Sequence, residues 1–252
     1  MLMRSILSAL LGAAAFLPVA HAKPLCRSVN YDGATFTVCE VSGEADIRLF
    51  HSRTDGTLIG NFASLKTELE GQGERLLMAM NAGMYHEDRR PVGLYVQDGE
   101  ETARLQPRPG PGNFGLVPNG VFYIDETGPQ VRETLAFQAS GLDPEFATQS
   151  GPMLVIDGAL HPKFRRESES RKRRNGVGVT EDGETVYFAI SEGIVNFHHF
   201  ARLFRDELGT PNALYLDGTI SRLYVEEEGR SDFGLPMGPI VGVVSKDDGQ
   251  GE

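Results

Sequence analysis

The sequence predicts an α+β fold: a mixed, mostly antiparallel sheet with a few packed helices, all in a single domain. Segments typical of strands, either alternating or continuously apolar, clearly outnumber helical patterns. Most consecutive strands are separated by short turns, which favours antiparallel pairing because a parallel pair needs a long crossover. One amphipathic segment, residues 196–208, lies between two predicted strands and is long enough to be such a crossover.

The N-terminal segment, residues 1–22, has the pattern of a secretory signal peptide. Arg4 supplies a positive start, residues 6–19 form a short apolar run, and Ala20-His21-Ala22 fits a small-x-small cleavage site. An uncleaved anchor is the alternative, although the apolar run is short for a membrane span. We therefore expect residues 23–252 to form the folded domain and the protein to be periplasmic or secreted.

Turn-forming residues separate the elements predicted in the first half of the chain. Phe62, Leu65 and Leu69 recur at helical spacing, and Gly71-Gln72-Gly73 ends that helix. The predicted elements are a hairpin over residues 31–41 turning at Asp32-Gly33, a strand over 46–51, the helix over 62–69, and strands over 76–80, 92–97 and 115–125.

The second half begins with a buried strand over residues 153–156 that turns at Asp157-Gly158. A helix over 196–208 has an apolar stripe that includes Phe197, Phe200 and Phe204, and Gly209 follows it as a cap. The remaining predicted elements are a hairpin of 175–180 with 185–191 around Asp182-Gly183, strands over 213–217, 223–225 and 240–244, and a polar, frayed tail over 246–252.

The composition is that of an acidic globular protein. Hydrophobic residues make up 40% of the chain and the formal net charge is −11. A charge of that sign argues against a nucleic-acid partner, whose phosphates attract basic proteins. Beyond the leader no stretch is apolar enough to cross a bilayer, so we expect no membrane span after signal removal.

Cys26 and Cys39 are the two cysteines of the chain. In an oxidising compartment a pair near one terminus is expected to form a disulfide. Two free thiols are the alternative. A catalytic or zinc-binding role fits less well, because no histidine or further cysteine lies near them in sequence.

The strand over residues 213–217 ends in Asp217-Gly218, and Ser221 follows four residues after the aspartate. Gly218 allows a tight turn, which holds Asp217 at the end of a rigid strand, where catalytic residues are often placed. The plainer interpretation is an Asp-Gly turn between two strands, which says nothing about chemistry.

Three other segments are candidates for the same cleft, and three of the four set a polar side chain at a strand end beside a glycine. They are Asn81-Ala82-Gly83, Gln149-Ser150-Gly151-Pro152 and Arg174-Asn175-Gly176. Together with Asp217 they are able to form a cleft for an anionic substrate. Glycine amides approach a phosphate closely, an arginine binds it bidentately, and a carboxylate acts as acid, base or nucleophile at a sugar carbon.

A glycosidase normally needs a second carboxylate, and none is equally well placed. The candidates are Glu192, Glu87 and Asp88. The basic stretch over residues 165–174 has the plainer interpretation of a solvated loop, with Arg174 the exception because it directly precedes a strand. His86 is a candidate proton carrier or an exposed loop residue. His198 and His199 are adjacent on a helix and so point in different directions, which is poor geometry for binding one metal ion.

These motifs, in this order and spacing, resemble the phosphodiester glycosidase family over roughly residues 75–245. The segments that carry the resemblance are Asn81-Ala82-Gly83-Met84-Tyr85, Gln149-Ser150-Gly151-Pro152-Met153-Leu154, Arg174-Asn175-Gly176-Val177-Gly178 and Leu216-Asp217-Gly218-Thr219-Ile220-Ser221. The family's animal member removes N-acetylglucosamine from a sugar phosphodiester, and bacterial relatives are exported proteins, some linked to exopolysaccharide or cell-wall sugars. The resemblance implies a site lined by Asn81, Gly83, Gln149, Arg174, Asp217, Gly218 and Ser221.

The chain departs from the commonest family pattern at Ala82-Gly83-Met84-Tyr85, often Gly-Gly-Phe-Phe, and at Thr219, often glycine. Both changes narrow the space near the backbone, so substrate choice is expected to differ from that of the animal enzyme.

The sequence thus predicts an exported hydrolase that cleaves a sugar-1-phosphodiester without a metal or other cofactor. Asp217, Arg174 and Asn81 are its predicted catalytic residues. Its predicted substrate-binding residues are Gly83, Gln149, Ser150, Gly151, Asn175, Gly176, Gly218 and Ser221. Two alternatives remain: a non-catalytic binding protein for glycans or sugar phosphates, and a metal-dependent phosphodiesterase with Asp217 and Asn81 as ligands.

Overall fold

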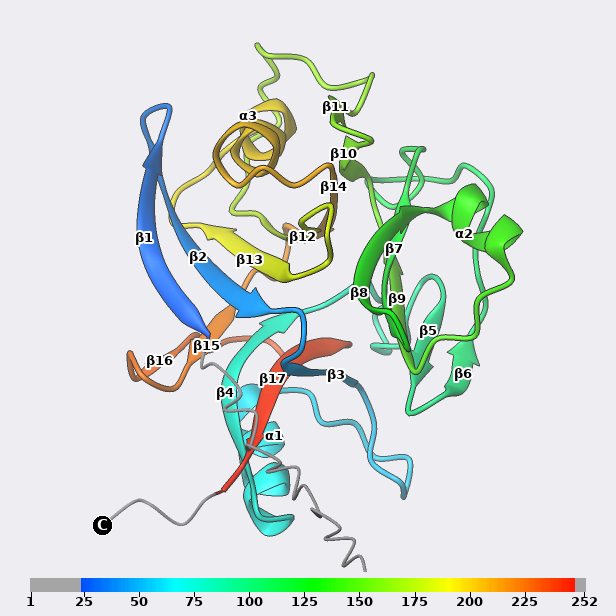
Figure 1. Ribbon diagram of the computed structural model, residues 1–252, viewed down its shortest axis with the longest axis vertical. Helices are drawn as coiled ribbons and strands as arrows, with labels where there is room; N and C mark the ends of the chain where they lie inside the picture. The colour runs from blue at the N-terminus through cyan, green and yellow to red at the C-terminus, as the bar shows by residue number, and fades with distance from the viewer. Residues whose placement is uncertain (1–23, 248–252) are drawn as a thin grey trace, which may run out of the picture.

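A computed structural model describes residues 24–247 of the chain, so the predicted signal peptide and most of the predicted frayed tail lie outside the described part. The strands form three sheets, and every strand pair within residues 24–247 is antiparallel (Figure 1). Strands account for 42% of the residues and helices for 12%, so the fold is more strongly β than the predicted balance.

The seven-stranded sheet has the order β1-β2-β13-β12-β14-β10-β11. The bounds of its strands are β1 Leu25–Tyr31, β2 Ala34–Ser42, β13 Thr185–Ser191, β12 Asn175–Val179, β14 Asn212–Asp217, β10 Met153–Ile156 and β11 Ala159–Leu160. The predicted turn between β1 and β2 is confirmed: Asp32 and Gly33 have φ of 47° and 80°, the left-handed values that a two-residue hairpin turn requires.

The two smaller sheets have five strands each. The first has the order β16-β15-β4-β17-β3, with β16 Arg230–Ser231, β15 Leu223–Val225, β4 Glu74–Asn81, β17 Ile240–Lys246 and β3 Asp46–Phe50. The second has the order β6-β5-β9-β7-β8, with β6 Glu100–Ala103, β5 Tyr95–Gln97, β9 Phe146–Ser150, β7 Gly120–Asp125 and β8 Gly128–Glu133.

Three short helices cover the sheets from outside (Figure 1). Helix α1 (Phe62–Gly71) packs on β4, and α2 (Thr134–Ser140) packs on β7 and β8. Helix α3 (Phe197–Arg202) continues as a π-helical turn, η1 (Leu203–Glu207), and covers the outer face of the seven-stranded sheet. The predicted crossover is confirmed: α3 joins β13 to β14, which lie on either side of β12.

One apolar core is shared by all three sheets. Its members include Val41 of the seven-stranded sheet, Leu49 of the first small sheet and Phe122 of the second. A second cluster lies under α3, where Phe197, Phe200 and Phe204 pack against the strands, as the predicted apolar stripe requires.

The structure differs from the sequence prediction in the second small sheet. Its strand β7 begins at Gly120 rather than residue 115, because residues 115–119 form a loop against the Pro/Gly-rich segment. Helix α2 and strands β6, β8, β9, β11 and β16 were not predicted. Strand β9 is buried on both faces although its last three residues, Thr148, Gln149 and Ser150, are polar, so no alternation marks it.

The predicted disulfide between Cys26 and Cys39 is present, and the two residues lie directly opposite each other in the β1–β2 pair. Within residues 24–247 no helix is long and apolar enough to cross a membrane.

Candidate functional site

Three strand ends from two sheets meet at the predicted site. Strand β4 ends at Asn81, β12 begins at Asn175 and β14 ends at Asp217. The Asn81 amide donates to Asn175 Oδ1 at 3.3 Å, and the Asp217 backbone N–H donates to the same oxygen at 3.0 Å. Three of the four predicted motifs are therefore in direct contact.

Both asparagines are fully buried, and protein groups engage their amides. Asn175 Nδ2 donates to the carbonyl of Asn81 at 2.9 Å, and Asn81 Oδ1 accepts the Arg222 backbone N–H at 2.8 Å. Buried polar groups are almost always paired in this way, and such a network fixes the relative positions of the chains it joins. The two amides therefore hold the strand ends in register around Asp217.

The register of β12 and β14 shifts between two neighbouring pairs, Asn175–Asp217 and Gly176–Tyr215. Asp217 therefore borders an irregularity in the strand pairing. A β-bulge of this kind re-aims a side chain at the end of a strand. Asp217 Oδ1 accepts the Thr219 backbone N–H at 2.8 Å and also that of Gly218, while Oδ2 accepts no hydrogen bond within residues 24–247. One carboxylate oxygen thus anchors the turn and the other remains available.

Burial raises the pKa of Asp217, although the backbone N–H groups of Thr219 and Gly218 and the charge of Lys172 act in the opposite direction. Ser221 closes the turn, because its hydroxyl donates to the Asp217 carbonyl at 2.9 Å. A carboxyl group with a raised pKa in a fixed turn is suited to acid–base or nucleophilic chemistry near neutral pH.

Arg174 is fully buried, with 0% of its surface exposed. Its Nε donates to the Val195 carbonyl at 2.9 Å, and one terminal nitrogen donates to the Ser170 carbonyl at 3.0 Å. The guanidinium carbon lies 3.6 Å from the centroid of the Phe197 ring, a cation–π contact. The other terminal nitrogen, Nη1, makes no well-formed hydrogen bond within residues 24–247, and the Tyr215 hydroxyl is a polar neighbour of the guanidinium.

Tyr215 lies between Arg174 and Asp217. The guanidinium carbon of Arg174 is 5.3 Å from the centroid of the Tyr215 ring, and the Tyr215 hydroxyl lies so close to Gly218 that a side chain there would collide with it. Burial raises the pKa of Tyr215, and the charge of Asp217 adds to that rise while Arg174 opposes it. Within residues 24–247 the hydroxyl is buried and makes no well-formed hydrogen bond, and the side chains of Arg174 and Asn113 are its hydrogen-bonding neighbours.

Two buried donors, Arg174 Nη1 and the Tyr215 hydroxyl, therefore lie near each other and near the carboxyl group of Asp217 without a well-formed hydrogen bond within residues 24–247. Arg174 and Asp217 make no ion pair within 4.0 Å in the described part of the chain, so the carboxylate does not satisfy the guanidinium. An unpaired buried donor costs about 1–3 kcal/mol. A phosphate oxygen would accept from both groups, and the arginine would gain the anion that its buried charge lacks.

The Gln149 motif contacts the Asp217 motif through Ser150, but the Gln149 side chain itself bonds elsewhere. The Gln149 side chain is 1% exposed and bonds to the backbone of Leu94 and Gln106 and to the Thr134 hydroxyl, which ties the second small sheet together. The Ser150 hydroxyl donates to the Leu216 carbonyl at 2.9 Å and joins β9 to β14. No hydrogen bond brings Gln149 to Asp217, and its predicted contact with substrate remains a prediction.

The predicted glycines lie at close approaches between elements. A side chain at Gly83 would meet the backbone of Gln149 at 2.7 Å, one at Gly151 would meet Asn119 at 2.6 Å, and one at Gly176 would meet the Leu214 carbonyl at 2.8 Å. These contacts explain the glycines by packing, whereas Gly218 is the one that lies against the unpaired Tyr215 hydroxyl.

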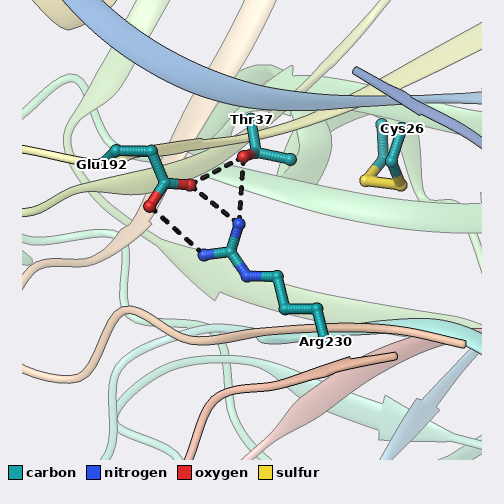
Figure 2. The surroundings of a disulfide bond; sticks show 5 residues. Cys26, Thr37, Glu192 and Arg230 are labelled. Carbon is teal, nitrogen blue, oxygen red and sulfur yellow. Dashed lines mark hydrogen bonds and ion pairs between the residues drawn. A yellow bond between two sulfur atoms is a disulfide. The ribbon is translucent and has the colours of Figure 1, made fainter. Parts of the chain in front are cut away.

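Glu192, a candidate second carboxylate, is held in an ion-pair network (Figure 2). Its Oε1 accepts from the Thr37 hydroxyl at 2.7 Å and from Arg230 at 2.8 Å, and Arg173 lies 3.4 Å from Oε2. Burial acts to raise the pKa of Glu192, but the bonds from Arg230 and Thr37 outweigh it and lower that pKa. A carboxylate kept ionised in this way is unsuited to donating a proton.

The other candidates for acid, base or metal chemistry lie away from Asp217 or on the surface. His86, Glu87 and Asp88 are exposed on the loop after β4, and the His199 ring contacts the Tyr31 carbonyl at 3.0 Å. Among residues 24–247, no three His, Cys, Asp or Glu side chains are grouped so that they could hold a metal ion. Apart from Arg174, the basic side chains of residues 165–174 are exposed, with Arg173 half-buried. This exposure supports the interpretation of the stretch as a solvated loop.

Four residues near Asp217 were not predicted: Tyr215, Tyr85, Lys172 and Arg222. Tyr215 precedes Asp217 by two positions, and this strand spacing could have indicated a shared face. Burial raises the pKa of Tyr85, and the Asp217 carboxylate raises it further while Arg222 opposes the rise, so both charges act on the Tyr85 hydroxyl. No local pattern marks Arg222 or Lys172.

A separate groove of about 880 Å³ lies at the far ends of β2 and β13, beside the turn between β7 and β8. Several carboxylates line it, among them Glu40, Glu44, Asp125 and Asp182. It contains none of the predicted site residues, and its charge would repel a phosphate, so we assign the candidate site to Asp217 and not to this groove.

Comparisons with known proteins show the family and the fold of the chain. Residues 74–241 match the sequence model of a family described as phosphodiester glycosidase. The uncharacterized protein YigE of Escherichia coli (strain K12) is 36% identical over 180 residues, which cover 71% of this chain and 70% of YigE. The matched region contains every residue of the candidate site.

A solved structure has a similar fold. It is the catalytic domain of zebrafish N-acetylglucosamine-1-phosphodiester alpha-N-acetylglucosaminidase, auto-inhibited by its pro-peptide. The TM-score is 0.62 at 13% sequence identity, with 91% of this chain and 85% of the zebrafish chain covered. At that identity the likeness shows the shared fold.

Proposed function

This chain belongs to the phosphodiester glycosidase family, and we propose that it is an exported hydrolase that cleaves the bond between a sugar anomeric carbon and a phosphodiester oxygen. The family supplies the reaction class, and the name of the zebrafish structural neighbour describes a phosphodiester glycosidase. The substrate of this chain would be a small glycan or sugar bearing a phosphodiester.

One observation carries the proposal: two fully buried donors, Arg174 Nη1 and the Tyr215 hydroxyl, are unpaired next to a carboxylate with a free oxygen. A neutral sugar alone would not need a buried guanidinium. A phosphodiester carries one negative charge and two unesterified oxygens, which match these two donors in charge and number.

In the proposed reaction Arg174 and Tyr215 hold the phosphodiester, and Asp217 Oδ2 acts at the anomeric carbon as nucleophile or as base for a water molecule. The carbon–oxygen bond breaks, the phosphate leaves with the bonding electrons, and the sugar gains a hydroxyl from water. Because a phosphate monoester anion is a good leaving group, the reaction needs little help from a general acid. A second carboxylate is then not essential, in keeping with the ionised state of Glu192.

Asn81, Asn175 and Ser221 are positioning residues in this scheme. Each is hydrogen-bonded to the chain near Asp217, and together they fix the direction of its free oxygen. We therefore exclude Asn81 from the groups that contact substrate, in contrast to the role predicted for it from the sequence. A misplaced carboxylate would reduce the rate even though no reacting group is lost.

The test is hydrolysis of a panel of sugar-1-phosphodiesters by the purified mature chain and its variants. Asp217→Asn and Arg174→Met should each reduce kcat/KM by about 100-fold or more, in line with the loss of a group that stabilises the transition state. Arg174→Met keeps the side-chain volume, and thermal unfolding checks that the variant is folded. Unchanged activity in both variants would disprove the assignment.

Matched controls are available in the same chain. Arg171 is an exposed arginine three positions from Arg174, and Asp98 is an exposed aspartate in another Asp-Gly turn. Arg171→Ala and Asp98→Asn should leave kcat/KM unchanged. Saturable binding of the phosphodiesters without product would instead support the non-catalytic binding protein.

The proposed location outside the cytoplasm is supported by the leader-like sequence of residues 1–22 and by the Cys26–Cys39 disulfide. Fractionation of cells that express the full chain, with N-terminal sequencing of the product, tests it. Recovery of an uncleaved chain in the cytoplasm would contradict this part of the proposal.

A further inference from the structure

The segment between β16 and β17, residues 232–239, borders the candidate site. Arg222 donates to the Leu235 carbonyl at 2.5 Å, and the Tyr85 hydroxyl donates to the Pro236 carbonyl at 3.4 Å. The charges of Asp217 and Arg222 both act on the Tyr85 hydroxyl. The segment therefore packs against Arg222 and Tyr85, and we call it the 232–239 loop.

The start of this loop is held firmly in place. Asp232 Oδ2 accepts from Arg173 and from Arg230, both at 3.2 Å, and from the Leu223 backbone N–H, also at 3.2 Å. Arg230 is in turn fixed by Glu192, as Figure 2 shows. Because several charged groups share these bonds, the residue that follows Asp232 has a defined position.

Phe233 follows Asp232 and is 96% exposed. Leu235 on the same loop is 71% exposed, and Ile194, two residues after Glu192, is 66% exposed. A single exposed apolar residue is unremarkable, but three on two anchored loops beside a candidate site indicate a binding surface. An aromatic ring in such a place offers a flat face for stacking.

Arg222 provides a second cation on this side of the site. Its side chain is largely buried, and within residues 24–247 only Nη1 makes a hydrogen bond, to the Leu235 carbonyl. Gly234, with φ of 147°, lies so close to the guanidinium that any side chain there would collide with it. The loop thus packs on Arg222, and Nε and Nη2 make no hydrogen bond within residues 24–247.

We propose that Phe233 and Arg222 form the aglycone subsite, which binds the group on the far side of the phosphodiester from the cleaved sugar. That group would contain a ring with a flat apolar face, which stacks on Phe233, and polar substituents that accept from Arg222. A nucleobase and the apolar face of a second sugar both have this chemistry. The inference rests on the proposed function, because it names the substrate class of that same site.

The test compares product-side ligands that differ only in the group on the phosphate: methyl phosphate, glucose 6-phosphate and uridine 5′-monophosphate. Their Kd values are measured by calorimetry on the mature, disulfide-bonded chain. The wild-type protein should bind at least one ring-bearing phosphate about fivefold tighter than methyl phosphate, the lower end for stacking on an aromatic side chain. The preferred ligand distinguishes a nucleoside from a sugar aglycone.

Phe233→Ala should remove this preference without changing the Kd of methyl phosphate, and Phe233→Tyr should retain it. The matched control is Leu135→Ala, which removes a 55% exposed apolar side chain on α2. A wild-type protein without a preference, or a preference that survives Phe233→Ala, would overturn the subsite.

Turnover separates this inference from the proposed function. Hydrolysis with equal aglycone selectivity in wild type and Phe233→Ala refutes the subsite and leaves the enzyme assignment intact. A Phe233-dependent preference in binding, without hydrolysis of the matching sugar-1-phosphodiesters, supports the subsite and refutes the enzyme assignment.

Discussion

Replacing Tyr215 with phenylalanine removes one oxygen from the candidate site and nothing else. The hydroxyl is fully buried and makes no well-formed hydrogen bond within residues 24–247, and the side chains of Arg174 and Asn113 are its hydrogen-bonding neighbours. A buried polar group without a partner weakens the folded state by about 1–3 kcal/mol. Tyr215→Phe should therefore leave the free energy of unfolding unchanged or raise it by about 1 kcal/mol.

The same substitution should strongly reduce activity. If the hydroxyl donates to the phosphate in the transition state, its loss should lower kcat by about 100-fold, the effect of removing one preorganised donor, which corresponds to about 2.7 kcal/mol. Stability is measured by urea unfolding and activity with the best substrate of the phosphodiester panel. A variant that is at least as stable as wild type and much less active identifies a group kept for function.

The matched control is Tyr123, a buried tyrosine of the second small sheet. Its hydroxyl donates to Gln130 at 2.7 Å, so Tyr123→Phe should reduce stability by about 1 kcal/mol and leave kcat unchanged. The test is whether the two variants differ in opposite ways: Tyr215→Phe should lose activity and keep its stability, and Tyr123→Phe should lose stability and keep its activity. If Tyr215→Phe loses more than about 0.5 kcal/mol of stability, the hydroxyl has a structural partner. If its kcat is unchanged, the hydroxyl does not contact the reacting phosphate.

Three further predictions concern other parts of the site and fold. Lys172→Ala removes a charge that lowers the pKa of Asp217, so the acid limb of kcat/KM against pH should move to higher pH, since the ionised carboxylate is the active form and is lost as pH falls through its pKa. An acid limb at the wild-type pH would contradict this. The pair Cys26→Ala and Cys39→Ala should lower the free energy of unfolding by about 3 kcal/mol in urea, with kcat unchanged. Gly218→Ala should abolish hydrolysis in a folded protein, because the added carbon meets the tyrosine hydroxyl; full activity would show that the turn can move.

The sequence was sufficient to predict the local elements but not their partners. The β1–β2 hairpin, helix α1 and the crossover helix α3 follow from turn residues and apolar periodicity within each segment. Division into three sheets could not be predicted, because it depends on which distant strands pair, and short strands joined by short turns are compatible with one sheet or several. Strand β9 was missed for a related reason: its polar side chains are buried because other elements satisfy them.

The candidate site was predicted in part. The sequence placed Asn81, Arg174 and Asp217 together, and the structure brings Asn81 into the network around Asp217 and puts Tyr215 between Asp217 and Arg174. The sequence could not indicate that the Asn81 amide is already hydrogen-bonded, since that bond depends on Arg222, which is distant in sequence. Nor could it distinguish Tyr215 from the apolar residues beside it.

The buried polar residues at this site fall into two groups, which differ in whether their donors and acceptors are hydrogen-bonded to the chain. The buried amides of Asn81 and Asn175 bond to the chain and so contribute to the stability of the strand ends. Arg174 Nη1 and the Tyr215 hydroxyl lack well-formed partners within residues 24–247, and an unpaired buried donor costs about 1–3 kcal/mol. Because both groups lie near Asp217 and could donate to the same anion, their position argues for a bound phosphate.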